Sequence, residues 1–93
     1  MSITIGHTTF DRVRYDADAD VLYLHVGDPS RASDFDESPE GHALRFGPNR
    51  ELVGVTIVNA KSLLKQGAPI AITIPERFTV DPSVLAHAVE DAA

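Results

Sequence analysis

The sequence contains no cysteine. Without thiols the chain can form no disulfide, no thiolate metal site and no cysteine nucleophile. It also lacks an apolar run of the ~18 residues that a membrane span needs, and residues 1–6 contain neither the basic nor the apolar segment of a secretory signal. We therefore expect a cytoplasmic protein of bacterial type that makes no membrane contact.

Basic residues are scarce, with 8 Lys and Arg against 14 Asp and Glu and a net charge of −6. Residues 11–40 hold nine acidic residues and three arginines, so the net charge of this segment equals that of the whole chain. An acidic chain repels phosphate backbones, so we expect no nucleic-acid partner. Two explanations of the local charge remain open. Aspartate is favoured in tight hairpin loops, and an acidic surface would suit a basic protein partner.

The length of 93 residues and the hydrophobic fraction of 43% indicate one globular domain over residues 1–93 with a modest core. Two segments that alternate between polar and apolar residues, 10–15 and 21–26, predict a first β-hairpin. Its loop is residues 17–20, and its two apolar rows must share a face. This requirement sets Tyr15 opposite Leu22, Val13 opposite Leu24, Arg14 opposite Tyr23, and Arg12 opposite His25.

A polar edge strand is expected within residues 31–38, followed by a second hairpin from residues 42–46 and 52–58. Here Arg45 should lie across from Gly54, where the missing side chain leaves room for the arginine stem. The apolar partners expected in this hairpin are Phe46 with Val53, Leu44 with Val55, and His42 with Ile57.

The remaining segments predict two helices and one strand. Asn59 should cap a short helix over residues 60–65 that ends at Gly67, and residues 70–74 read as a strand. Asp81-Pro82 is typical of a helix start, and the following helix carries an apolar stripe of Val84, Leu85, Ala88 and Val89. The predicted fold is α+β: a small antiparallel β-meander sheet of about five to six strands, with a short helix and a C-terminal amphipathic helix.

Two blocks of sequence carry a family resemblance. Residues 15–24 read YDADADVLYL, and residues 49–60 read NRELVGVTIVNA. In this order the blocks resemble the bacterial family designated domain of unknown function 2283, over roughly residues 10–65, which leaves residues 66–93 as a strand–helix extension. The resemblance implies a small β-rich domain and brings no known activity, cofactor or catalytic residue.

The motifs that would indicate a metal or catalytic site are incomplete. Asp16, Asp18 and Asp20 match the start of a calcium loop, but its sixth position is Val21 and its twelfth is Gly27. No two of the four histidines are spaced three or four apart, no serine lies in a nucleophile elbow, and no glycine-rich phosphate loop is present. We expect no metal, no cofactor and no catalytic residue.

One constellation remains, the sheet face that carries Arg12, Arg14, Tyr23 and His25. Two cations beside a phenol and an imidazole could bind an anion or a partner's carboxylates. Alternatively, this is the solvated side of a half-buried sheet, with the neighbouring acidic loop supplying intramolecular partners for the arginines.

The favoured interpretation is a non-enzymatic protein-interaction module that self-associates as a homodimer. The expected dimer contact is the apolar surface of Ile70, Ile72, Ile74, Val84, Leu85 and Val89. One alternative is an antitoxin-like neutraliser, whose acidic strip would cover a small basic ribonuclease toxin. A second alternative is a small enzyme with an unrecognised pocket.

Overall fold

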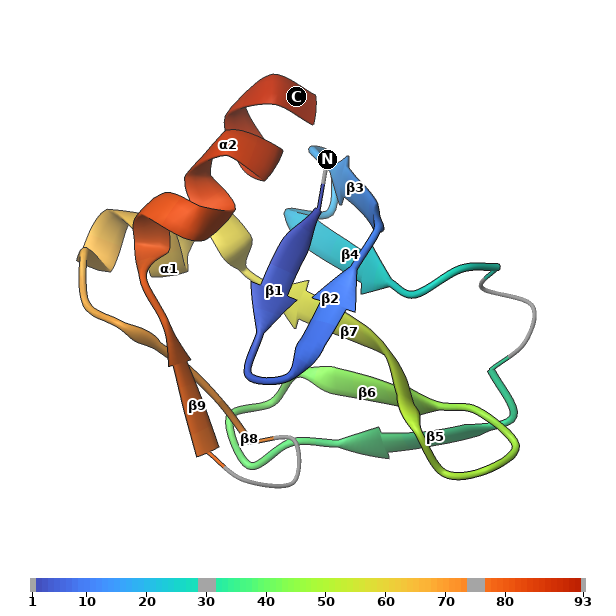
Figure 1. Ribbon diagram of the computed structural model, residues 1–93. Helices are drawn as coiled ribbons and strands as arrows, with labels where there is room; N and C mark the ends of the chain where they lie inside the picture. Colours follow the sequence, from blue (N-terminus) through green and yellow to red (C-terminus); the bar gives the residue numbers. More distant parts are fainter. Residues whose placement is uncertain (1, 29–31, 74–76, 93) are drawn as a thin grey trace.

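The computed structural model describes residues 2–28, 32–73 and 77–92, and they form an α+β fold (Figure 1). The elements in chain order are β1 (Ile3–Ile5), β2 (Thr8–Phe10), β3 (Arg12–Asp16), β4 (Val21–His25), β5 (Asp34–Glu37), β6 (Ala43–Phe46), β7 (Leu52–Val58), α1 (Ala60–Gln66), β8 (Ile70–Thr73), β9 (Arg77–Val80) and α2 (Pro82–Ala92). The predicted α+β class, antiparallel sheet and two helices are confirmed. No helix within the described ranges is long and apolar enough to cross a membrane.

The main sheet has five antiparallel strands in the order β3-β4-β7-β6-β5. This order departs from a simple meander, because β4 pairs with β7 and the chain crosses to the far edge before β5. Burial explains the order. The apolar strands β4 and β7 occupy central positions, whereas all four residues of the polar strand β5 are exposed at the edge.

The register of the first hairpin is confirmed at all four predicted pairs. In the second hairpin, Leu44 pairs with Val55 and Arg45 with Gly54, as predicted. A register shift between Arg45 and Phe46 then sets Phe46 opposite Leu52, so the predicted pairing with Val53 is wrong. The register that sets His42 opposite Ile57 is the observed one, but β6 begins after His42, so the ladder does not include this pair.

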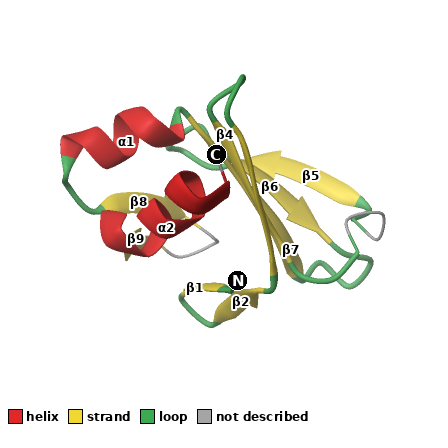
Figure 2. Cartoon of the chain, turned by 90° about the horizontal axis from the view of Figure 1, so that it is seen from above, coloured by secondary structure: helices red, strands yellow, loops and turns green. Residues whose placement is uncertain are grey.

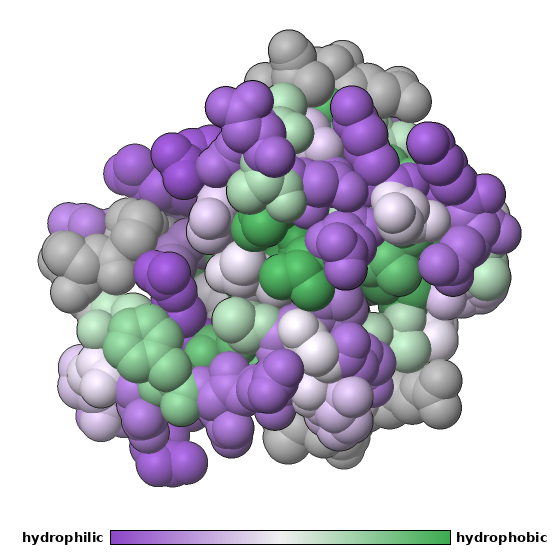
Figure 3. Space-filling model, turned by 180° about the vertical axis from the view of Figure 1, so that it is seen from behind, coloured by the Kyte–Doolittle hydropathy of each residue, from purple (hydrophilic) through white to green (hydrophobic). Residues whose placement is uncertain are grey.

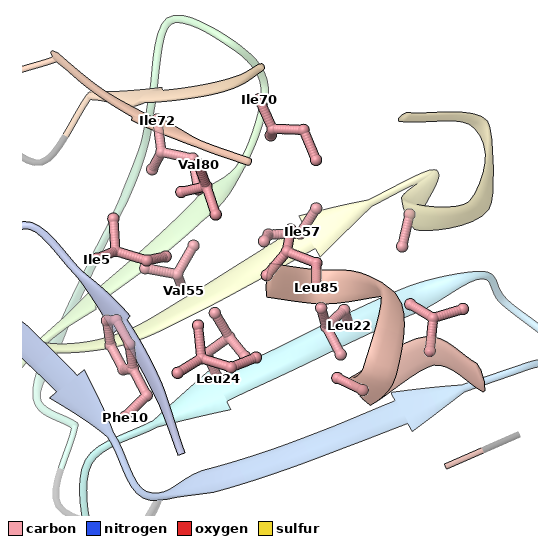
Figure 4. Packing of buried hydrophobic residues seen from close by; sticks show 14 of the residues in the cluster. Ile5, Phe10, Leu22, Leu24, Val55, Ile57, Ile70, Ile72, Val80 and Leu85 are labelled. Carbon is pink, nitrogen blue, oxygen red and sulfur yellow. The ribbon is translucent and has the colours of Figure 1, made fainter. Parts of the chain in front are cut away.

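One face of the main sheet is covered and the other is open (Figure 2). Both helices and the small sheets β1–β2 and β8–β9 lie on the covered side. Their apolar side chains and those of the main sheet form one buried cluster (Figure 4). Its largest fully buried members are Phe10, Ile5, Leu22, Leu24, Ile57, Ile72, Leu85 and Val55.

Helix α1 is capped from a distant loop and not by its neighbour in sequence. Asn59 adopts a left-handed conformation (φ 56°), and its side chain makes no capping hydrogen bond, so the predicted Asn59 cap is wrong. Instead, Asp20 Oδ1 accepts a hydrogen bond from the backbone N–H of Lys61 (3.0 Å), and the Asp20 carbonyl accepts one from Ala60 (3.2 Å). The predicted end of α1 at Gly67 is confirmed, with φ 68°.

The predicted start of α2 is also confirmed, because Asp81 Oδ1 accepts a hydrogen bond from the backbone N–H of Ser83 (2.9 Å). The helix buries Leu85, Ala88 and Val89 against the sheet, whereas Val84 points outward and is 42% exposed.

The apolar residues expected at a dimer contact mostly lie inside the chain. Ile70, Ile72, Leu85 and Val89 are only 0–4% exposed. Ile74 lies outside the described residues, so Val84 is the one described residue of the expected contact that is substantially exposed. Because burying a side chain within the chain removes it from any partner's reach, a contact through these residues needs the fold to open. The described residues of the expected contact thus offer little surface to a partner in this fold.

The faces of β4 generate a first prediction. Leu24 is 2% exposed in the core, whereas Tyr23 points to the open face and is half-buried. Leu24→Ala should lower the free energy of unfolding by about 2–5 kcal/mol, and Tyr23→Ala should lower it less. Urea denaturation of both variants measures this, and the reverse order would mean that the two faces of β4 are assigned the wrong way round.

Asp20 generates a second prediction. Its carboxylate also accepts a hydrogen bond from the Tyr15 hydroxyl (2.6 Å), which raises the pKa of Tyr15 to about 12 and lowers the pKa of Asp20. Asp20→Ala removes the cap of α1 and the partner of Tyr15, and should cost about 1–2 kcal/mol or more.

Asp20→Asn is the matched control for that experiment, because asparagine tolerates the positive φ (55°) of this position and still offers an oxygen acceptor. It should be less destabilising than Asp20→Ala in thermal and urea unfolding. Equal losses in both variants would show that the negative charge of the carboxylate, which both variants lack, determines the effect, and not the oxygen acceptor that asparagine keeps.

Candidate functional site

The open face of the main sheet brings the four predicted site residues together. Because side chains opposite each other in neighbouring strands share a face, the pairing register defines two rows that cross all five strands. The first row is Arg12, His25, Gly54, Arg45 and Phe35. The second row is Arg14, Tyr23, Thr56, Ala43 and Glu37.

Arg45 is the site residue that sequence reasoning missed. Its place opposite Gly54 was predicted, but the pairing of β4 with β7 was not, and this pairing sets His25 on the other side of the same glycine. The sequence feature that could have indicated Arg45 is Gly54, a residue without a side chain in the middle of a strongly β-prone strand.

The arginines of this face contact aromatic rings. The Arg14 guanidinium lies 4.8 Å from the centre of the Tyr23 ring, and that of Arg45 lies 5.5 Å from the centre of Phe35. Phe35 is 65% exposed. Such cation–π contacts orient a guanidinium without neutralising its charge.

The expected carboxylate partners for Arg12 and Arg14 are not found among the described residues. There, the one ion pair within 4 Å joins Arg50 to Asp34 (3.7 Å). Asp16 instead accepts hydrogen bonds from the backbone of its own loop. The prediction that the loop 16–20 pairs with the arginines is therefore wrong for the part of the loop and face that the structure describes.

His25 lies over Gly54 and is 6% exposed. A Cβ atom at position 54 would come within 2.8 Å of the His25 ring and 3.3 Å of Arg45 Cβ, so the glycine makes room for both side chains. His25 Nδ1 lies 2.9 Å from the carbonyl oxygen of Val26. Because a carbonyl only accepts hydrogen bonds, Nδ1 carries a proton. The other ring nitrogen, Nε2, is buried and has no partner.

These residues surround an open hollow of about 1040 Å³. Its charged lining consists of Arg12, Arg14 and Arg45 against the single carboxylate of Asp11. Asp11 accepts a hydrogen bond from the backbone N–H of Gly27 (2.9 Å), which lowers the pKa of Asp11. The hollow therefore has a positive lining in a chain of net charge −6. From behind, Figure 3 shows apolar residues interspersed with hydrophilic ones on this side of the molecule.

A second hollow, of about 550 Å³, is lined by His42 and Glu40. His42 is 3% exposed, its Nδ1 has no partner, and burial lowers its pKa. The Glu40 carboxylate accepts hydrogen bonds from the backbone N–H (3.0 Å) and the hydroxyl (2.8 Å) of Thr73. The two buried histidines thus line separate hollows. In the described ranges, no three His, Asp or Glu side chains gather as metal ligands would.

Comparison with known families gives one match, to the family described as "Protein of unknown function (DUF2283)", over residues 12–61. The chain belongs to the DUF2283 family. The matched segment contains all five strands of the main sheet, so the arginines, Tyr23 and His25 of the hollow lie within the DUF2283 part of the chain. No curated protein and no solved structure matches the chain.

The burial of His42 generates a prediction about pH. A histidine whose pKa is lowered by folding binds its proton more readily in the unfolded chain. The free energy of unfolding is therefore unaffected by His42 protonation above the pKa of histidine in the unfolded chain, near 6.5. It declines as the pH falls below that value. The free energy of unfolding of the DUF2283 chain should decrease between pH 7.5 and pH 5.5.

Urea unfolding at both pH values measures this difference, and His42→Gln should reduce it. His87 is exposed on α2, and His87→Gln is the matched control that should leave the difference unchanged. An equal pH dependence in His42→Gln and the wild type would contradict the assignment. The lowered pKa values of Asp20, Glu40 and Asp81 affect the free energy of unfolding at lower pH, where carboxylates take up protons.

Proposed function

We propose that the chain is a non-enzymatic protein-interaction module that self-associates through the open face of its five-stranded sheet. The observation that carries this proposal is that the helices and small sheets of the described chain all lie on one side of the main sheet (Figure 2). A solvated sheet face is common in itself. This one, however, carries arginine and aromatic side chains, the types that are enriched in protein interfaces.

Charge complementarity selects a second copy of the chain as the partner. The cations Arg12 and Arg14 lie at the β3 edge of the open face, and Glu37 lies at the opposite edge on β5. A two-fold axis parallel to the strands would stack two such faces with β3 of each copy over β5 of the other. Arg14 would then face Glu37 of the second copy, and Arg12 would face Phe35 of the second copy.

A two-fold axis perpendicular to the strands would instead stack β3 on β3 and bring arginines together. The repulsion of like charges disfavours that arrangement. The parallel axis also sets Thr56 of each copy near the centre of the contact, where its small side chain permits close packing. This contact replaces the buried residues within 70–89 as the proposed interface.

The proposal predicts a dimer at micromolar concentration in analytical ultracentrifugation. Arg14→Glu should give a folded monomer, because it sets two carboxylates against each other in each half of the contact. Combining it with Glu37→Arg should restore the dimer. Within one chain these two residues lie on opposite edge strands, so only an intermolecular pairing explains a rescue.

Val84→Glu is the control, since Val84 is exposed on α2, away from the open face. It should leave the dimer intact. A monomeric wild type would defeat the proposal, and a dimer lost in Val84→Glu but kept in Arg14→Glu would place the contact on α2.

The antitoxin-like neutraliser is a second candidate, favoured by the edge strand β5. Its residues Asp34, Asp36 and Glu37 are all exposed, and an edge strand can accept a strand from a partner. A small basic ribonuclease encoded beside this gene, inhibited by the wild type and not by a variant with Asp34→Asn and Asp36→Asn, would support this function. Inhibition by both forms would argue against it.

A further inference from the structure

We infer that the hollow around His25 is an oxyanion-binding site, in which Arg12 and Arg45 hold a carboxylate, sulfate or phosphate group beside the His25 ring. The site lies on the same open face as the proposed contact, but it goes beyond that function because one chain is sufficient to build it.

The first argument is charge. Three arginines and one carboxylate line the hollow, and none of the three arginines forms an ion pair with a carboxylate of the described residues. The carboxylate, Asp11, is engaged by the backbone N–H of Gly27. A guanidinium group offers a planar fork of donors that matches the oxygens of a carboxylate or phosphate. The hollow therefore favours an anion over a neutral or cationic ligand.

The second argument is the His25 ring, which lines the hollow and is 6% exposed. The hydrogen bond from Nδ1 to the Val26 carbonyl fixes the ring in place. The ring lies over Gly54, so it gives the hollow a fixed wall between the two arginine strands.

The third argument is the floor of the site. Gly54 lies between His25 and Arg45 in the row that crosses the sheet, and Arg12 lies on the other side of His25. The absent side chain leaves the space in which the ring and the Arg45 stem approach each other. An oxyanion above this floor can contact donors from two different strands, Arg12 on β3 and Arg45 on β6.

The test is an NMR titration of the full chain with sodium sulfate, with sodium chloride holding the ionic strength constant. Sulfate is suitable because it stays fully ionised between pH 6 and pH 8. We expect saturable shifts at Arg12, His25 and Gly54. Arg45→Gln and, independently, Arg12→Gln should weaken binding about tenfold, the effect of losing a charged hydrogen bond.

Arg50→Gln removes the same charge from an exposed position in the 47–51 turn and should leave sulfate binding unchanged. Shifts that grow linearly without saturation, or that are equal in Arg45→Gln and Arg50→Gln, would overturn the site. A parallel titration with acetate shows whether a carboxylate, such as a partner protein would supply, binds in the same place.

Sedimentation of the same samples separates this inference from the proposed function. A monomer that binds sulfate in a saturable way retains the site and defeats the dimer. Because Arg12 also lies in the proposed contact, sulfate should compete with the dimer, so a dimer that sulfate neither binds nor dissociates retains the interaction module and defeats the site.

Discussion

The structure depends on the covering of one face of a five-stranded antiparallel sheet by a chain of only 93 residues. Leu22 and Leu24 on β4 and Val55 and Ile57 on β7 are almost completely buried beneath the helices and small sheets. Because alternate residues of a strand point to opposite faces, burying this row commits the residues between them to the other side. The open face is thus a consequence of how the core is built.

The pairing of β4 with β7 connects the fold to the candidate site. It places the two most apolar strands at the centre of the sheet and moves the acidic strand β5 to the edge. The same pairing sets His25 against Gly54 and so brings Arg45, from a distant part of the sequence, into the row that begins with Arg12. The element order that completes the core therefore also assembles the positive hollow.

Local sequence patterns predicted the parts of the fold that depend on neighbouring residues. The register of the first hairpin was predicted correctly at four pairs, because two apolar rows joined by a four-residue loop permit one register. The bulge at Arg45 and Phe46 was missed, since nothing in the alternation of residues 42–46 indicates it. The hairpin β1–β2 was missed because its three-residue strands are too short to show a period, although they bury Ile3, Ile5 and Phe10.

Contacts between residues far apart in the sequence were not indicated by any local sequence pattern. The cap of α1 comes from Asp20, 41 residues before Lys61, and Asn59 was a reasonable but wrong candidate from its position alone. The apolar stripe of α2 indicated that the helix packs against another surface, but it did not identify that surface. In the structure the surface is the chain's own sheet. For the site, Arg12, Arg14, Tyr23 and His25 followed from alternation, whereas Arg45 required the three-dimensional pairing of β4 with β7.

The central claim is that one face of the sheet holds the fold together while the other is free to make contacts. Val55 and Thr56 test it directly, because they are adjacent on β7 and point to opposite faces, with Val55 1% exposed and Thr56 half-buried. Val55→Arg and Thr56→Arg should be compared by circular dichroism and sedimentation at one concentration. The account predicts that Val55→Arg fails to fold, whereas Thr56→Arg folds with a thermal midpoint close to that of the wild type and is monomeric. Unfolding of both variants, or a folded Thr56→Arg that still self-associates like the wild type, would contradict it.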